Sequence, residues 1–251
     1  MILDEIISRT KKRVEKLPET FPEQDGFRHA SLKEAIRSAE KKNPVIAEIK
    51  CASPSGGIIR RNVDMAMMAG VLADGGCVGI SVLTEPYFFG GSCADIARVK
   101  ESVRVPVLRK DFVIDIRQIF ETKALGADAV LLIAAVLGDR LPAFVDAVYD
   151  AGLEPLVEVR NAREINDALL TRAEVIGINN RDLTTMRIDR STTRVLSEKL
   201  RANGRIVVSE SGMRSADDVR EIRPYCDAFL IGSSIMRHAE PRKILEEFVC
   251  A

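Results

Sequence analysis

Lysine and glutamate side chains lie at the ends of three short apolar runs, and their positions suggest acid–base chemistry. Glu48 and Lys50 stand two residues apart in the first run, Lys110 ends the second, and Glu158 lies within the third. Side chains two residues apart on a strand point to the same face, so Glu48 and Lys50 can meet. Because an unpaired carboxylate is costly to bury, Glu158 should be paired or used in chemistry. Converging lysines and carboxylates can shift one another's pKa toward neutrality, which suits proton transfer; the alternative is a structural ion-pair network.

Two further segments have the composition of a phosphate site. Ser211-Gly212 and Gly232-Ser233-Ser234 each follow a short apolar run. Small residues let backbone N–H groups and a helix start hold a phosphate, as the loops after the last two strands of a parallel barrel commonly do. Each segment alone could be an ordinary turn, but the two together favour phosphate.

Other residues complete the candidate site. Asn179 and Arg181 share a face if their strand continues to them. Phe89, Phe112 and Leu131 would form an apolar seat for a ring, although residues of these types more often belong to the plain core. Spacing alone therefore predicts a barrel enzyme that uses metal-free acid–base chemistry on a small phosphorylated substrate.

The elements that must position these residues alternate regularly along the chain. Apolar runs bounded by turn residues predict strands, and apolar residues three and four apart predict helices. Eight strands alternate with eight helices, which predicts a (β/α)8 TIM barrel and a single domain over residues 1–251. The strands are expected at 45–49, 78–83, 105–110, 129–133, 155–159, 175–179, 206–209 and 228–231, and the helices at 64–73, 92–103, 113–125, 139–151, 162–170, 191–201, 215–222 and 241–248.

Residues 1–44 precede this alternation and predict a helical extension. A charged amphipathic helix is expected over 3–16. Ser31, with Glu34 in capping-box spacing, predicts the start of a second helix that runs to about Lys42. The extension could plug one end of the barrel, cover the mouth of the site, or do both.

Composition excludes several classes of function. The 251 residues contain 37 basic and 37 acidic side chains, so no nucleic-acid or anionic-membrane surface is expected. The longest apolar run, 129–138, is too short to span a bilayer. Five cysteines without a Cys-x-x-Cys pair indicate reduced thiols of a cytoplasmic protein. His29 and His238 are the only histidines and lack metal-ligand spacing, so a zinc site is not expected. No other metal and no cofactor is expected either.

Six motifs together resemble one known family. From about Val45 to Phe248 the chain resembles the indole-3-glycerol-phosphate synthases of tryptophan biosynthesis, and the N-terminal helices fit the extension of that family. The motifs are Glu48-Ile-Lys50 followed by Ser53-Pro-Ser-x-Gly57, Arg109-Lys-Asp-Phe112, Pro155-Leu-Val-Glu158-Val, Gly177-Ile-Asn-Asn-Arg-Asp-Leu183, Ser209-Glu-Ser-Gly212 and Leu230-Ile-Gly-Ser-Ser234. Members close the pyrrole ring of 1-(2-carboxyphenylamino)-1-deoxyribulose 5-phosphate with loss of carbon dioxide and water.

The resemblance implies a role for each residue that matches a motif. Lys110 resembles the general acid of ring closure, Glu158 its acid–base partner in later steps, and Lys50 the lysine that engages substrate anions and helps dehydration. The catalytic set it implies is Glu48, Lys50, Lys110, Glu158, Asn179 and Ser211. The substrate contacts it implies are Ser53, Phe89, Phe112, Leu131, Arg181 and Glu210, with Gly212, Gly232 and Ser233 at the phosphate. Partners expected are the small phosphorylated substrate and, from the resemblance, other tryptophan-pathway enzymes.

Two departures and two rival interpretations remain. Many members carry basic residues where this chain has Cys51 and Gly56, and Gly56-Gly57 should loosen the loop. Another phosphate-binding barrel enzyme is one rival: a phosphoribosylanthranilate isomerase would need a Cys/Asp pair, and a Schiff-base aldolase would use Lys110 covalently. The other rival is a catalytically inactive barrel kept as an assembly module, which would be expected to have lost Lys50, Lys110 or Glu158.

Overall fold

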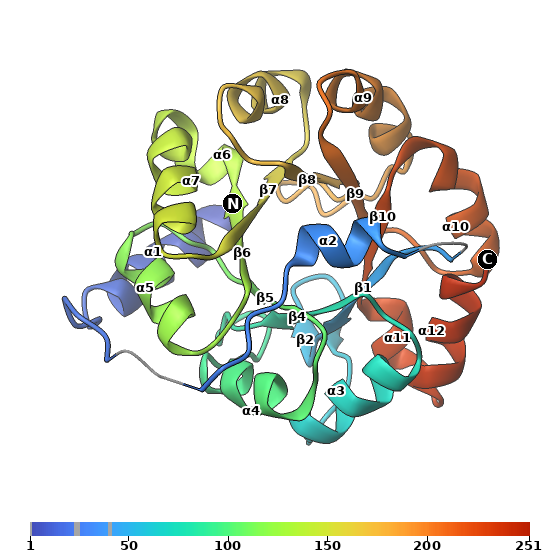
Figure 1. Cartoon of the computed structure of the whole chain (residues 1–251), viewed down its shortest axis with the longest axis horizontal. Helices are drawn as coiled ribbons and strands as arrows, with labels where there is room; N and C mark the ends of the chain where they lie inside the picture. The colour runs from blue at the N-terminus through green and yellow to red at the C-terminus, as the bar shows by residue number, and fades with distance from the viewer. Residues whose placement is uncertain (1, 23–25, 40–41) are drawn as a thin grey trace.

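A closed barrel of eight parallel strands forms the centre of the chain in its computed structural model, which describes residues 2–22, 26–39 and 42–251. Consecutive strands are neighbours, and pairing of the last strand with the first closes the barrel. The predicted (β/α)8 TIM barrel is therefore confirmed (Figure 1). Its strands are β1 (Val45–Ile49), β4 (Gly79–Leu83), β5 (Val107–Lys110), β6 (Ala129–Ile133), β7 (Glu154–Val159), β8 (Val175–Asn179), β9 (Ile206–Glu210) and β10 (Ala228–Ile231).

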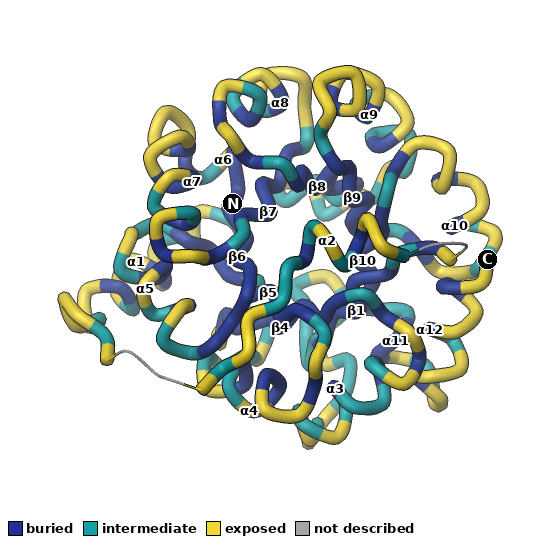
Figure 2. Tube along the Cα trace, in the orientation of Figure 1, coloured by how far each residue is buried: buried dark blue, intermediate teal, exposed yellow. Residues whose placement is uncertain are grey.

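Helices surround the barrel and cover its outer face. Figure 2 shows the strands buried and the outward surfaces of the helices exposed. Apolar residues of strands and helices form one continuous core cluster in the layer between them. The surrounding helices are α3 (Met65–Asp74), α4 (Ala94–Ser102), α5 (Arg117–Ala124), α6 (Ala134–Leu137), α7 (Leu141–Asp150), α8 (Ala162–Leu169), α9 (Ser191–Ala202), α10 (Ala216–Ile222), α11 (Ser233–Arg237) and α12 (Pro241–Val249). None of the described helices is long and apolar enough to cross a membrane.

Strand alternation separates an apolar barrel floor from a polar mouth. Along β9, Ile206 and Val208 belong to the inner apolar cluster, and Glu210 follows two residues later. Leu156 precedes Glu158 in the same way along β7. Because side chains two apart share a face, β1, β5, β7 and β9 each contribute apolar groups below and one ionisable group near the carboxyl end. The inner face is thus ready for chemistry at one end only.

The two N-terminal helices lie at opposite ends of the barrel. Helix α2 (Leu32–Arg37) crosses the barrel centre in Figure 1 and packs apolar residues onto the inner cluster. The backbone N–H of Lys33 donates to Glu154, at the start of β7, over 2.9 Å, so α2 plugs the amino end. Helix α1 (Ile2–Val14) instead brings apolar side chains to the mouth. The extension therefore both plugs the barrel and borders the site.

Several predicted boundaries differ from the structure. The second helix ends at Arg37 rather than near Lys42, and residues 40 and 41 lie outside the described part of the chain. Ser31 does accept the Glu34 N–H as its N-cap. Helix α5 begins at Arg117, four residues later than predicted, because the Gln118 side chain accepts the backbone N–H groups just before it.

Several short elements were not predicted. The segment expected as one helix over 139–151 is a 3-10 turn, Gly138–Arg140, followed by α7, whose Pro142 lacks an N–H for a continuous helix. Helix α6 precedes that turn, and α11 follows β10. A two-stranded hairpin, β2 (Ala52–Ser53) with β3 (Gly57–Ile58), interrupts the connection from β1 to α3. Elements of two to five residues are too short for a periodic pattern.

Candidate active site

A cavity of about 590 Å³ opens at the carboxyl ends of the strands. Its walls come from the barrel strands, the β2–β3 hairpin, α1 and the loops after β8, β9 and β10. Every residue predicted for the site borders this one cavity. These are Glu48, Lys50, Ser53, Phe89, Lys110, Phe112, Leu131, Glu158, Asn179, Arg181, Glu210, Ser211, Gly212, Gly232 and Ser233.

Lys110 stands between two carboxylates at the cavity floor. Its Nζ lies 3.2 Å from Glu158 Oε2 and 3.2 Å from Glu210 Oε2. The three residues lie at the carboxyl ends of β5, β7 and β9, so this edge of the barrel brings together groups about 50 and 100 positions apart in sequence. Both carboxylates are buried, and the lysine side chain is 15% exposed. This arrangement can hold and exchange protons among largely buried groups.

Burial and charge act in opposite directions on these groups. Burial alone would lower the pKa of Lys110, but the charges of Glu210, Glu158 and Glu48 raise it above its usual value. Burial raises the pKa of Glu210 to about 7, with Lys110 opposing the shift and Glu158 adding to it. Lys110 is therefore cationic at neutral pH, whereas Glu210 exchanges a proton near neutrality. The sequence placed Glu210 only among substrate contacts; its position two residues beyond Val208 on the inner face was the available signal.

A second ion pair lies at the carboxyl end of β1. Glu48 Oε1 is 2.5 Å from Lys50 Nζ, as expected for two side chains that share one strand face. The Glu48 side chain is 2% exposed, and its Oε2 has no hydrogen-bond partner among the described residues. Glu210 Oε1 is likewise buried without a partner in that set. Two carboxylate oxygens thus remain available to accept protons or hydrogen bonds.

Two glycines leave room for the carboxylates. A methyl group on Gly177 would overlap Glu210 Oε1 of the neighbouring strand. On Gly232 it would lie 2.5 Å from Glu48 Oε1 and 2.9 Å from Glu48 Cβ. Gly232 is the first residue of a predicted phosphate segment, and the lack of a side chain there also leaves space for Glu48. A substitution at Gly232 would therefore disturb the Glu48–Lys50 pair as well as the loop.

The loop after β8 is held by a buried amide network. Asn180 donates to Ser209 Oγ over 3.1 Å and to the Ser211 carbonyl over 3.0 Å, while its own Oδ1 accepts from Thr193. Its neighbour Asn179 borders the cavity and accepts the Arg181 N–H through Oδ1 at 2.9 Å. The two adjacent asparagines therefore have different positions: Asn180 anchors the loops, and Asn179 borders the cavity.

The predicted phosphate segments form two adjoining loops. Ser211 and Gly212 both have positive φ, 66° and 96°, a conformation that a serine adopts at a cost in energy. Ser234 Oγ donates to the Met213 carbonyl over 2.6 Å and so ties the loop after β10 to the loop after β9. Both loops border the cavity together. Small side chains there leave the backbone accessible to an anion.

Two carboxylates hold the aromatic wall. The rings of Phe89 and Phe112 lie 6.2 Å apart between centroids and tilt by 38°. Buried Glu85 accepts the backbone N–H groups of residues 87, 88 and 89 and so fixes the turn that carries Phe89. Asp111 Oδ1 accepts the Phe112 N–H over 2.8 Å. The two phenylalanines of the predicted apolar seat thus lie side by side on turns that buried carboxylates hold.

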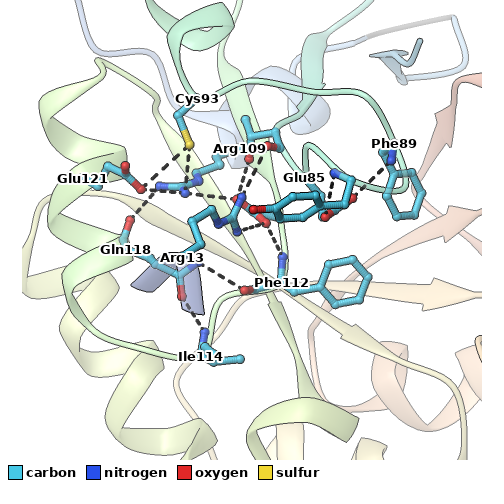
Figure 3. A network of polar contacts seen from close by, with 12 residues as sticks. Arg13, Glu85, Phe89, Cys93, Arg109, Phe112, Ile114, Gln118 and Glu121 are labelled. Carbon is cyan, nitrogen blue, oxygen red and sulfur yellow. Dashed lines mark hydrogen bonds and ion pairs between the residues drawn. The ribbon is translucent and has the colours of Figure 1, made fainter. Parts of the chain in front are cut away.

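A buried polar network supports this wall from behind (Figure 3). Asp111 accepts Arg13 from α1 over 2.6 Å, Thr84 over 2.7 Å and Arg109 over 3.1 Å. Although Arg109 adjoins Lys110 in sequence, alternation turns it away from the cavity, toward Glu121 at 2.7 Å. Of the charged Arg109-Lys110-Asp111 triplet, Lys110 therefore lies between the cavity carboxylates, and the other two residues belong to the network that holds α1.

Several cavity residues were not predicted. Helix α1 contributes Ile2, Leu3 and Ile6, and the loops after β9 and β10 lead to Arg214 and Arg237. Arg214 follows Gly212 by two positions, and Arg237 ends α11, so closeness to the phosphate segments could have identified both. Among the described residues, no three His, Cys, Asp or Glu side chains are arranged to hold a metal ion.

Comparison with known proteins identifies one family over nearly the whole chain. The family model described as indole-3-glycerol phosphate synthase matches residues 3–248. A protein named indole-3-glycerol phosphate synthase from Caldanaerobacter subterraneus subsp. tengcongensis is 44% identical over 253 residues, covering 99% of this chain and 98% of that protein. One of the same name from Methanocaldococcus jannaschii is 39% identical over 264 residues, with 99% and 98% covered.

Solved structures that resemble the chain share its fold at low sequence identity. Tryptophan synthase from M. tuberculosis superposes with a TM-score of 0.67 at 12% identity, covering 88% of this chain and 98% of that chain. Thiamine phosphate pyrophosphorylase from Pyrococcus furiosus gives a TM-score of 0.61 at 16% identity, covering 84% and 95%. At such identities the likeness concerns the barrel alone.

Proposed function

The chain belongs to the indole-3-glycerol phosphate synthase family, and we propose which residues carry out each part of the reaction. The enzyme closes the pyrrole ring of 1-(2-carboxyphenylamino)-1-deoxyribulose 5-phosphate and releases carbon dioxide and water. In our proposal residues 1–251 act as one barrel domain, with residues 1–44 as its extension. The carrying observation is the position of Lys110, between Glu158 and Glu210 at the cavity floor.

Lys110 acts in ring closure. The aromatic carbon that bears the carboxylate attacks the ribulose carbonyl carbon, and the carbonyl oxygen takes up a proton. The raised pKa of Lys110 keeps it cationic before reaction, so it can stabilise the developing negative charge and donate that proton. Its acidity increases when Glu210 is protonated, because one stabilising carboxylate is then neutral. A Glu210 pKa of about 7 makes both states available at neutral pH.

Glu158, Lys50 and Glu48 act after the new carbon–carbon bond has formed. Release of carbon dioxide returns its bonding electron pair to the ring and restores aromaticity. Dehydration then removes a hydroxyl group from one carbon and a proton from its neighbour beside nitrogen. We assign proton uptake to Glu158 and protonation of the leaving hydroxyl to Lys50, which Glu48 holds at 2.5 Å. Asn179 contributes a side-chain amide at the cavity edge for orienting the intermediate.

The remaining cavity residues bind the two ends of the substrate. Phe89, Phe112 and Leu131 offer a rigid apolar surface for the anthranilate ring. The loops at Ser211-Gly212 and Gly232-Ser233 receive the phosphate. In this proposal Lys50 also binds the substrate carboxylate. With the ring on the apolar surface and the phosphate at the loops, the carboxylate would otherwise be buried without a cationic partner.

One assay tests this function directly. Purified protein mixed with the carboxyphenylamino-ribulose phosphate should produce an indole fluorescence signal together with one equivalent of carbon dioxide per molecule. Borohydride added with substrate should trap no covalent adduct on Lys110, since the proposed chemistry forms no Schiff base. Absence of both products would contradict the assignment, and a borohydride adduct would favour an aldolase.

A further inference from the structure

Three arginines gather at one end of the cavity without carboxylate partners. Arg181, Arg214 and Arg237 all border the cavity, from the loops after β8, β9 and β10. Within residues 2–22, 26–39 and 42–251, no carboxylate oxygen lies within 4.0 Å of their guanidinium nitrogens. The polar contacts of the Arg181 side chain are with the Ser55 hydroxyl at 3.1 Å and the Met186 carbonyl at 3.2 Å. Both partners are neutral, so Arg181 has no ion-pair partner within 4.0 Å among the described residues.

The charges of Arg214 and Arg237 are both close enough to act on Arg181. Burial lowers the pKa of Arg181, Glu48 opposes the shift, and the positive charges of Arg214 and Arg237 lower it further. Like charges held together without a counter-ion destabilise the folded state. An anion bound among the three arginines would relieve this repulsion. The relief would in turn strengthen the binding of the anion.

Gly56 in the β2–β3 hairpin is shaped around Arg237. A methyl group on Gly56 would overlap Arg237 Nη2 and approach Ser53 Oγ to 2.8 Å. Gly56 does not have a positive φ, so the backbone conformation itself does not require glycine. The requirement is space: the guanidinium occupies the volume that any side chain at position 56 would fill. Glycine at position 56 therefore leaves space for the guanidinium of Arg237, which α11 carries.

We propose that Arg214 and Arg237 join Arg181 as the cationic part of the phosphate subsite, and that Gly56 is side-chain-free to admit Arg237. This inference deepens the proposed function and rests on it for the identity of the substrate. Arg214 follows Gly212 by two residues, and Arg237 follows Ser233 by four, so both cations border the loops assigned to the phosphate. A phosphate dianion offers enough oxygens for several guanidinium groups, whereas a carboxylate offers two.

The experiment compares Arg237→Gln and Arg214→Gln with a matched control, Arg187→Gln. Arg187 is exposed in the loop after β8 and does not border the cavity, so its loss makes the same charge change elsewhere. Loss of one charge-assisted hydrogen bond at an exposed position should raise KM about tenfold, with a smaller change in kcat. The inhibition constant of inorganic phosphate should rise by the same factor, and the control should match wild type in both.

A substrate analogue without the phosphate separates phosphate recognition from carboxylate recognition. For this analogue, the KM effects of Arg237→Gln and Arg214→Gln should disappear. If they persist, the arginines bind the carboxylate and the proposal is overturned. It is also overturned if KM and phosphate inhibition in both variants equal those of Arg187→Gln.

Gly56→Ala tests the spatial argument. It should raise KM by about the same factor as Arg237→Gln, since it displaces the same guanidinium. The double variant should then be no worse than either single variant, and multiplicative losses would mean that Gly56→Ala acts through Ser53 instead. Calorimetry of inorganic phosphate binding to wild type distinguishes failure of the proposed reaction from failure of the arginine proposal. Binding that depends on Arg237, without any turnover, would refute the reaction and leave the arginine site standing.

Discussion

Variants of the Glu48–Lys50 pair should differ in activity and in stability in ways that do not follow one another. The pair joins atoms 2.5 Å apart, with side-chain exposures of 2% for Glu48 and 16% for Lys50. A hydrogen bond to a charged group contributes about 1.5–3 kcal/mol, so Glu48→Gln should lower turnover by about 10- to 100-fold through loss of Lys50 placement. Lys50→Met removes the proton donor itself and should lower turnover by about 10²–10⁴-fold.

The double variant separates joint action from independent action. If Glu48 acts through Lys50, Glu48→Gln combined with Lys50→Met should be within about threefold of Lys50→Met alone. The assay is the initial rate of indole fluorescence at saturating substrate for wild type, both single variants and the double. Losses that multiply would refute the pairing, because they would show that each residue contributes on its own.

Thermal and urea melts provide the second half of the test. Lys50→Met leaves the Glu48 carboxylate buried without its cation, which should lower the free energy of unfolding by about 3 kcal/mol. Adding Glu48→Gln removes that uncompensated charge and should restore most of the loss. The double variant should thus be more stable than Lys50→Met while being no more active. Activities that simply follow stability across the four proteins would indicate a structural ion network.

Three further predictions concern the carboxylates around Lys110. Glu158→Gln keeps the shape of the side chain and removes the base, so kcat should fall about 10²–10⁴-fold with little change in melting temperature; a fall within a few-fold would remove Glu158 from proton transfer. Burial raises the pKa of Glu210 from 4.5 to about 7, so its contribution to stability is full below pH 4.5 and is lost as pH rises through 7. Between pH 4 and 8, the free energy of unfolding of wild type should fall by up to about 3 kcal/mol more than that of Glu210→Gln. If urea melts give the same pH dependence of this free energy for both proteins, the prediction is wrong. Gly177→Ala places a methyl group where Glu210 Oε1 lies. It should lower the free energy of unfolding, measured in urea melts, by about 1–3 kcal/mol and should also lower turnover. Unchanged values of both would show that the Glu210 side chain can move aside.

The barrel was predictable because its strands are short apolar runs ending in charge. Four strands, 45–49, 129–133, 175–179 and 228–231, have the predicted bounds, and the other four differ by one or two residues at an end. Alternation along each strand then places the ionisable residues at one end of the barrel. Strand periodicity thus carried the prediction that Glu48, Lys50, Lys110 and Glu158 border one cavity, as the structure shows.

What the sequence did not predict depends on packing between distant segments. Arg237 was missed because α11, the helix that carries it, has five residues and no periodic pattern. Gly56 was expected only to loosen its loop, and the position of the Arg237 guanidinium in the space beside it could not be predicted from the sequence. The anchoring of α1 was missed as well, because the pairing of Arg13 with Asp111 joins residues 98 positions apart.

The most direct test of the catalytic account is a single-turnover measurement on Lys110→Met and Lys110→Arg. The arginine variant keeps a cation between Glu158 and Glu210, but its guanidinium does not donate a proton at any ordinary pH. Both variants should lower the rate of ring closure by about 10²–10⁴-fold, while binding of inorganic phosphate, followed by calorimetry, should change little. A Lys110→Met rate within a few-fold of wild type would contradict the account, and full activity in Lys110→Arg would show that charge, not proton donation, is what Lys110 supplies.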